Sequence, residues 1–312
     1  MEKIAAIDIG SNAIRLTTAD LEHKDSILLD NRIRIPIRLG THAFSEEQTF
    51  SKTFIKNAQN AFREIRTTLD RVNVTRCRAV ATSALRDAKN SKEFIDAIYK
   101  SSGIKINTIS GDAEAELILK AIQHSDEIGD DADYLLFDLG GGSLELSLIE
   151  AGKIVSSSSI DIGTVRLLEF IKKSNDKKSV ELFIDTKLGS IKSFLKKELR
   201  NSKGLTVVGT GGNFRRLIKL KNSIWNKKSK YVTPDEIDQI LVILEDNSYL
   251  DRIEKFDLRS DRADVIIPAL KLISKVLEGL PVKKVTAPKI GLIQGILLDM
   301  SDGKTKLDQI LH

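Results

Sequence analysis

Two segments, IAAIDIGSNAIRL at residues 4–16 and YLLFDLGGGSLEL at residues 134–146, decide the fold. When the first is shifted by 130 positions, Asp8 falls on Asp138, and one glycine and the last leucine also coincide. In each copy an apolar run leads through a glycine-bearing turn into a run of alternating polarity. This pattern predicts two β-hairpins that arose by duplication.

The elements expected after each hairpin also follow one order. In the first half we expect strands at 27–37, 77–81 and 104–109, a helix opened by a capping box of Ser45 and Gln48, and helices at 91–101 and 113–124. In the second half we expect strands at 154–160 and 205–208 and helices at 163–172 and 179–200. The repeated order predicts two related α/β domains.

The last third of the chain reads as mostly helical. We expect a helix beginning at Thr233, a long helix at 261–280 that Pro268 kinks, a strand at 283–286 and a helix at 290–300. Residues 126–133 are acidic and contain a glycine, so we expect the linker there. The predicted domains are 1–127 and 128–312, with a tail at about 300–312 packing back on the first.

Composition restricts the class of protein. Of the 312 residues, 41% are hydrophobic and 30% are charged, as in a soluble globular protein, and the length suits two domains. No apolar run is long enough to cross a membrane and no signal sequence opens the chain, so we expect a cytoplasmic protein without a membrane partner. The single cysteine, Cys77, excludes an internal disulfide and a cysteine-rich zinc site, and we interpret it as a structural thiol.

The net charge of +5 comes entirely from residues 131–312, which favours an anionic ligand such as polyphosphate or a nucleotide. Trp225 stands among lysines, but no nucleic-acid motif accompanies it, so we expect no nucleic-acid partner. The apolar C-terminal helices are as compatible with a homodimer as with a filled core.

Three glycine turns are candidate phosphate-binding sites. Small residues after a strand let backbone N–H groups approach phosphate oxygens closely, although such glycines are often only turns. The third turn also opens a helix, where the positive end of the dipole favours an anion. The candidate residues are Gly10, Ser11, Asn12, Gly140, Gly141, Gly142, Ser143, Gly209, Thr210, Gly211 and Gly212.

Acidic and basic side chains complete the candidate site. Asp8, Asp138 and Glu145 stand at strand ends, where they suit Mg²⁺ bridging phosphate oxygens, unless each aspartate only caps its own turn. Arg86 and Arg166 follow strands and suit bidentate phosphate binding, with Arg15 behind them as an alternative salt-bridge residue.

Hydrolysis also needs a group that orients or deprotonates water. The segment SGDAEAE at 110–116 begins a helix and offers Glu114 and Glu116, which point to different faces. From the residues alone, either glutamate is a candidate, and both also complement the helix dipole.

These segments together resemble the exopolyphosphatase and guanosine pentaphosphate phosphatase family (Ppx/GppA) of the actin-like ATPase superfamily. The resemblance is carried, in order along nearly the whole chain, by AAIDIGSNAIRL, ATSALRDA, ISGDAEAEL, LFDLGGGSLELSLIEAGKI, DIGTVRLLE, VVGTGGN and RADVIIPALKLI.

The resemblance implies two ribonuclease-H-like domains, each a mixed five-stranded sheet flanked by helices, with a cleft between them. It implies Glu114 as the residue that activates the attacking water, Arg86 as a phosphate ligand and Asp138, Gly140 and Glu145 as metal and phosphate positions. It also implies a requirement for Mg²⁺ or another divalent cation, and polyphosphate or guanosine pentaphosphate as substrate.

The chain departs from the family pattern at several positions. Asn213 stands where threonine or serine is usual, Ala13 where serine is frequent, and Ile293 and Gln294 where the family has an Arg-Glu pair. The C-terminal HD-type domain of longer members is not present in the sequence. The expected function is exopolyphosphatase; pentaphosphate hydrolysis at the same site, a phosphotransferase and a non-catalytic nucleotide sensor stay open.

Overall fold

The computed structural model describes residues 2–23, 26–125, 128, 132–174, 176–199, 204–303 and 305–311. The chain divides into two compact units: unit 1 contains Met1–His124 and Ile290–His312, and unit 2 contains Ser125–Lys289. Most of the linker expected at 126–133 lies outside the described residues. No helix within the described ranges is long and apolar enough to cross a membrane.

Unit 1 is built on a mixed sheet in which β3, β2, β1, β4 and β5 lie side by side. The three strands β1 to β3 are antiparallel neighbours, and β1, β4 and β5 run parallel. A short strand, β12, adds to β4. The bounds are β1 Glu2–Ile9, β2 Ile14–His23, β3 Ser26–Ile35, β4 Arg76–Ala81, β5 Ile106–Thr108 and β12 Gln309–Ile310.

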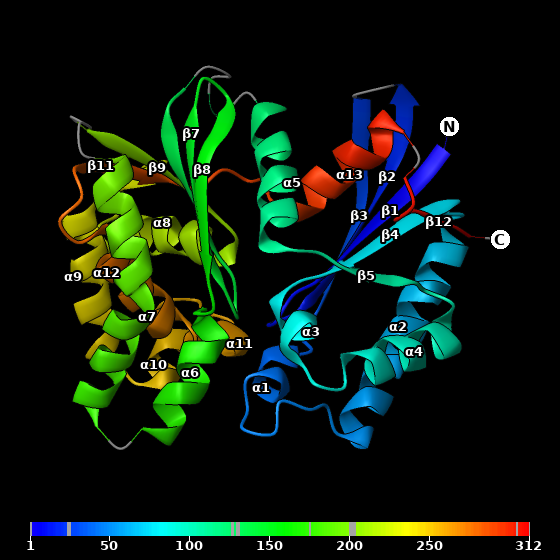
Figure 1. The fold of residues 1–312 in the computed structure, drawn as a ribbon, viewed down its shortest axis with the longest axis horizontal. Helices are drawn as coiled ribbons and strands as arrows, with labels where there is room; N and C mark the ends of the chain where they lie inside the picture. The colour runs from blue at the N-terminus through cyan, green and yellow to red at the C-terminus, as the bar shows by residue number, and fades with distance from the viewer. Residues whose placement is uncertain are drawn as a thin grey trace. The chain divides into compact units, whose positions relative to one another are not determined.

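Helices cover both faces of this sheet (Figure 1). Alternate residues of β1 and β4, including Ile7 and Cys77, face a core formed with α2 and α4. The opposite face, which includes Ala6, meets α13, which packs in turn on α5. The helices are α1 Leu39–Ala43, α2 Lys52–Arg71, α3 Ser83–Asp87, α4 Ser91–Ser102, α5 Gly111–Gln123 and α13 Leu292–Asp302.

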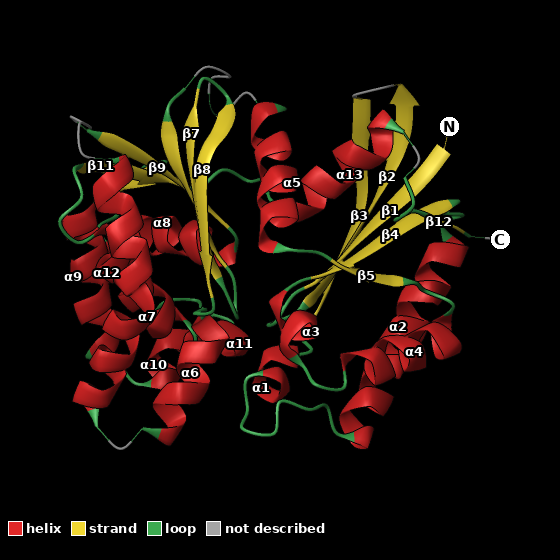
Figure 2. Ribbon diagram, viewed as in Figure 1, coloured by secondary structure: helices red, strands yellow, loops and turns green. Residues whose placement is uncertain are grey.

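Unit 2 repeats this strand order and these directions, with β8, β7, β6, β9 and β11 side by side and a short β10 added at β11 (Figure 2). Its bounds are β6 Tyr134–Leu139, β7 Leu144–Glu150, β8 Lys153–Ile160, β9 Leu205–Thr210, β10 Tyr231–Val232 and β11 Val282–Thr286. The duplication is therefore visible in the sheets. Counted over the described residues, each sheet has six strands rather than the expected five, because β10 and β12 were not anticipated.

One apolar core joins the β6 and β7 side chains to the helices of unit 2, with Phe137 against Phe214 at its centre. The helices are α6 Thr164–Lys173, α7 Lys177–Glu198, α8 Gly212–Ile224, α9 Pro234–Glu245, α10 Tyr249–Glu254, α11 Ser260–Ala263 and α12 Ile266–Leu277. The expected capping box at Thr233 is confirmed, since Thr233 and Glu236 bond each other's backbone N–H groups.

Three expectations need correction. The helix assigned to Ser45 begins at Lys52 instead, with Ser51 as its cap, because Gln48 has a φ of 53° and turns the chain. The helix expected over 261–280 is two helices, α11 and α12, and Pro268 lies in the first turn of α12, where its missing N–H costs no hydrogen bond. Residues 290–299, assigned by sequence to the second domain, belong to unit 1.

The contact between α13 and α5 leads to a first prediction. A Cβ added at Gly295 would lie 1.9 Å from the carbonyl oxygen of Leu117, so the two helices meet at backbone distance. Gly295→Ala should therefore lower the free energy of unfolding by about 1–3 kcal/mol, measured by urea denaturation followed by circular dichroism. Gly189→Ala is the matched control in α7, because an added Cβ there meets nothing within 4 Å and should stabilise the helix by about 0.5–1 kcal/mol. Equal effects of the two changes would contradict this reading.

Candidate functional site

The two predicted hairpin turns have the same hydrogen bond at equivalent positions. The Gly10 N–H donates to the Ala13 carbonyl at 3.2 Å, and the Gly140 N–H donates to the Ser143 carbonyl at 3.1 Å. Both turns lie at the end of the central strand of their sheet. The sequence prediction of a duplicated glycine turn is thus confirmed.

Each turn is also fixed by the helix that follows its hairpin. In unit 1 the Gly40 N–H at α1 donates to the Ser11 carbonyl at 2.8 Å, and Arg38 Nε donates to Asn12 Oδ1 at 2.8 Å. Arg38 was not singled out from the sequence. Its signal there was weak, because an arginine in a loop before a helix is usually a surface residue.

In unit 2 the first turn of α6 performs the same task. The Val165 N–H donates to the Gly141 carbonyl at 2.8 Å, and Arg166 Nε donates to the Gly142 carbonyl at 2.8 Å. A Cβ at Gly163 would lie 2.4 Å from Gly141 and Gly142 backbone atoms, so only glycine allows this approach. Arg166 therefore lies beside the second turn, and one of its nitrogens holds that turn in shape.

The third glycine turn lies next to the second, because β6 and β9 are parallel neighbours in which Asp138 is opposite Thr210. Thr210 Oγ1 donates to Asp138 Oδ1 at 2.5 Å. Gly211 has a φ of 90°, a conformation that favours glycine, and α8 begins immediately afterwards. The positive end of α8 therefore lies at this turn, as the sequence predicted.

Arg262 is a second residue that sequence reasoning did not single out. Its Nη1 donates to Asn213 Oδ1 at 3.1 Å, and a Cβ at Gly212 would lie 2.6 Å from its Nη2. It comes from α11, 49 positions further along the chain than Asn213. The segment RADVIIPALKLI contained it, but only the fold brings it to the third turn. Asn213, which departs from the family pattern, therefore has Arg262 as a hydrogen-bond partner.

The acidic residues of the two units differ in a way that bears on metal binding. Asp8 is opposite Arg15 across the first hairpin, and Arg15 Nη1 lies 2.5 Å from Asp8 Oδ2, so the alternative of a salt bridge holds for Arg15. The equivalent pair in unit 2 is Asp138 opposite Glu145. Two carboxylates directly opposite each other on one face repel unless a cation lies between them.

The chemistry of this donor set fits Mg²⁺. That ion uses one or two protein carboxylates and takes its other ligands from water and phosphate. Glu145 is buried and also accepts a hydrogen bond from Ser159 at 3.3 Å. The described residues contain no cluster of three or more histidine, cysteine, aspartate or glutamate side chains that suits a metal.

The candidate catalytic glutamate lies in unit 1. Ser110 caps α5 by accepting a hydrogen bond from the Ala113 N–H, and Glu114 follows in the first turn with only 9% of its surface exposed. Glu114 Oε2 lies 3.7 Å from Arg86 Nη1, which also donates to the Ile109 carbonyl at 2.7 Å. Glu116 is exposed, so the two glutamates that the sequence left open differ in burial.

Parallel strands bring these groups to one edge of the sheet in unit 1. The ends of β1, β4 and β5 lead into the first glycine turn, Arg86 and Glu114 respectively. Ser11 Oγ of the turn lies 3.0 Å from Ser83 Oγ of α3, and both side chains are buried. Unit 1 thus collects Asp8, Gly10, Ser11, Asn12, Arg86 and Glu114, and unit 2 collects the other predicted site residues.

Cys77 is a structural thiol. It is buried in the core on the face of β4 opposite to that of its two arginine neighbours, and burial, with the charge of Asp308, raises its pKa to about 12. At pH 8 only about one thiol in ten thousand would then be ionised.

We expect no alkylation of Cys77 by iodoacetamide in the native protein within an hour and complete alkylation in urea, measured by mass spectrometry. Rapid alkylation of the native protein would contradict this assignment.

Two sheets of one strand order, each with a glycine turn at the end of its first strand, define an α/β protein built from a duplicated unit. The chain belongs to the Ppx/GppA phosphatase family, whose model matches residues 23–304.

Individual relatives agree with this assignment. The chain is 29% identical over 292 residues to a bifunctional 3-dehydroquinate synthase/phosphatase of Fusobacterium nucleatum, covering 88% of this chain and 43% of that protein. It is 24% identical over 302 residues to a guanosine-5'-triphosphate,3'-diphosphate pyrophosphatase of Aliivibrio fischeri, covering 96% and 59%. The chain therefore spans about half the length of these curated relatives.

Solved structures cover the chain more evenly. A Ppx/GppA enzyme of Aquifex aeolicus superimposes with a TM-score of 0.73 at 26% identity, covering 96% of this chain and 99% of that one. An exopolyphosphatase of Cytophaga hutchinsonii superimposes with a TM-score of 0.85 at 23% identity, covering 97% and 99%, and supports the fold alone.

Proposed function

We propose that this chain is a Mg²⁺-dependent exopolyphosphatase, which hydrolyses the terminal phosphoanhydride bond of inorganic polyphosphate and releases orthophosphate. The observation that supports it most is the buried Glu114 at the start of α5, beside Arg86 and at the same sheet edge as the first glycine turn. A carboxylate held near a guanidinium and a phosphate-binding turn is suited to orient water towards a phosphorus atom.

In the proposed reaction the oxygen of a water molecule attacks the terminal phosphorus atom. The bridging P–O bond breaks, and its electron pair stays on the shortened chain. Glu114 accepts the proton of the water as the new P–O bond forms. Arg86 balances negative charge on the transferred phosphoryl group, since a guanidinium keeps its charge at any relevant pH.

The glycine turns would bind phosphate oxygens through their backbone N–H groups, with the third turn adding the positive end of α8. Asp138 and Glu145 would hold Mg²⁺, which supplies positive charge to the phosphate oxygens. Arg166 and Arg262 would keep the second and third turns in shape through their contacts with Gly142 and Asn213.

A second candidate function is removal of the 5'-terminal phosphate of guanosine pentaphosphate by the same residues. The similarity to the Aliivibrio fischeri pyrophosphatase supports it. The chemistry of the bond is unchanged, so only the rest of the substrate distinguishes the two candidates.

The test is phosphate release by the purified chain with Mg²⁺, from long-chain polyphosphate, guanosine pentaphosphate and p-nitrophenyl phosphate in parallel. We expect rapid release from polyphosphate, none from the monoester, and loss of activity with EDTA that excess Mg²⁺ restores. Faster release from pentaphosphate would favour the second candidate. Consumption of polyphosphate only with ADP would indicate a phosphotransferase, and binding without release would indicate a sensor.

A further inference from the structure

The C-terminal residues of the chain return to β4 in the middle of unit 1. Gln309 and Ile310 form β12, which pairs antiparallel with the start of β4. The Leu311 N–H then donates to the Thr75 carbonyl at 2.9 Å, and its side chain is buried in the core of unit 1. The segment is therefore an integral part of this unit.

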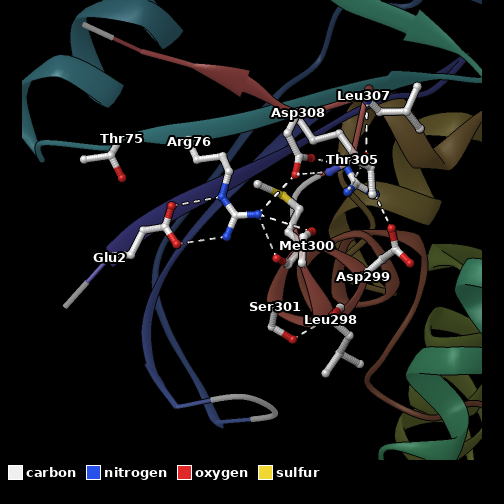
Figure 3. A network of polar contacts seen from close by, with 12 residues as sticks. Glu2, Thr75, Arg76, Leu298, Asp299, Met300, Ser301, Thr305, Leu307 and Asp308 are labelled. Carbon is white, nitrogen blue, oxygen red and sulfur yellow. Dashed lines mark hydrogen bonds and ion pairs between the residues drawn. The ribbon is translucent and has the colours of Figure 1, made fainter.

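A buried ionic cluster fixes this segment (Figure 3). Arg76 and Arg78 lie on one face of β4, with 3% and 1% of their surfaces exposed, and both bind the carboxylate of Asp308. Arg78 Nε donates to Asp308 Oδ1 at 2.6 Å and Arg76 Nη1 donates to Asp308 Oδ2 at 3.1 Å. Arg76 also donates to the Met300 carbonyl at 2.8 Å, at the end of α13.

Asp299 extends the cluster to another helix. Its Oδ2 accepts a hydrogen bond from Arg78 Nη1 at 2.6 Å, and its Oδ1 accepts one from Lys120 Nζ of α5 at 3.0 Å. Lys120 also pairs with Asp302. Burial would raise the pKa of Asp299, but hydrogen bonds from Arg78 and Lys120 outweigh it and hold the pKa below the ordinary value of 3.8.

The helix held in this way is the one that carries Glu114. Lys120 lies six residues after Glu114, less than two helical turns away. Between them, α13 reaches the α5 backbone at Leu117 through Gly295. At its other end α5 begins at the Ser110 cap, and Glu114 lies near Arg86.

We propose that the C-terminal brace sets the position of α5 and thereby of Glu114. The brace is defined here as Asp299, Asp308 and Thr305, whose Oγ1 accepts a hydrogen bond from Arg78 Nη2 at 3.1 Å. Lys120 and Asp299 are the positioning residues. This inference rests on the proposed function for its kinetic consequence. α5 packs on α13, and the link from Lys120 through Asp299 to Arg78 adds a charged tie between this helix and β4. Such a tie fixes where the first turn of α5, and with it Glu114, lies relative to the end of the sheet.

A purely structural role predicts something different. The Lys120 and Asp299 side chains are each 32% exposed, so breaking their link should cost little stability. A structural role alone would then leave the rate unchanged. A positioning role would lower kcat, because misplacing a catalytic group is costly even when the fold is intact.

The experiment compares Lys120→Met with Lys120→Arg and with Lys92→Met. Lys92 forms an exposed ion pair with Asp96 on α4 of the same unit and serves as the matched control. For Lys120→Met we expect kcat for polyphosphate to fall about tenfold with KM within about twofold of the parent. Lys120→Arg, which preserves the charge, and Lys92→Met should keep the parent kcat.

Hydrogen exchange of the α5 amides, measured without substrate, supplies a readout that does not depend on activity. We expect faster exchange in α5 for Lys120→Met and unchanged exchange in α2 and α4. Unchanged exchange in α5, or an unchanged kcat, would overturn the proposal. If Glu114→Gln itself retained phosphate release, the proposed function would fall, while the α5 exchange rates would still decide whether the brace holds this helix.

Discussion

Glu114→Gln should lower the rate of phosphate release from polyphosphate by about 10²–10⁴-fold, the usual contribution of a general base. Glutamine keeps the shape of the side chain but accepts no proton from water. Since Glu114 lies in the first turn of a capped helix, the fold should be unaffected. The measurement is kcat at saturating polyphosphate and Mg²⁺, with substrate binding followed separately by calorimetry.

Glu116→Gln is the matched control, because Glu116 lies on the same helix and is exposed. Its variant should release phosphate at the parent rate. If the Glu114 variant kept more than about a tenth of the parent kcat, a general base of this type would be excluded. If both variants lost activity together, the charge at the start of α5 would matter rather than a single carboxylate.

The sheets were predictable because their sequence signals are local. A glycine turn between an apolar run and an alternating run specifies a hairpin whatever surrounds it. The same pattern occurs twice in this chain, and both copies form hairpins. Short strands carry no such signal. Neither the two residues of β10 nor the two of β12 form a pattern, and each exists only because a longer strand offers it an edge.

The helix starts that were wrong show how a local signal misleads. Ser45 Oγ does accept a hydrogen bond from the Gln48 N–H at 3.3 Å, as a capping serine would. The chain then turns at Gln48, and the helix begins only after Ser51. The Ser51 Oγ accepts a hydrogen bond from the Phe54 N–H at 3.2 Å. Both serines make capping-type bonds, and only the backbone between them tells which one begins a helix.

The sequence predicted which residues form the candidate site, but not all of the contacts between them. Glycine turns, Glu114 and Arg86 stand in recognisable segments, whereas Arg262 reaches Asn213 from a segment far along the chain. The ionic contacts of the brace were not predicted, although a tail at about 300–312 was expected to pack on the first domain and Arg76 and Arg78 carried a signal. Two arginines two positions apart in an apolar strand lie on one face, and a buried face with two cations requires an acidic partner.

Asp308→Ala should lower the free energy of unfolding by about 3–5 kcal/mol, the largest stability effect we expect from a single substitution in this chain. Asp308 has only 2% of its side chain exposed and is the carboxylate shared by Arg76 and Arg78. Its removal leaves two buried guanidinium groups that keep only partly exposed carboxylate partners among the ion pairs of the described residues, Glu2 for Arg76 and Asp299 for Arg78. The measurement is urea unfolding of the full chain followed by circular dichroism.

Comparison with Glu2→Gln separates the effect of burying the carboxylate from the effect of pairing it with Arg76. Glu2 binds the same Arg76 at 2.9 Å, but its side chain is 38% exposed, so water replaces much of what the substitution removes. We expect a loss of less than about 1 kcal/mol for this variant. Equal losses for Glu2 and Asp308 would mean that burial adds nothing to the ion pairs. A larger loss for Asp308 means that the C-terminal segment is held chiefly by a charge that water cannot reach.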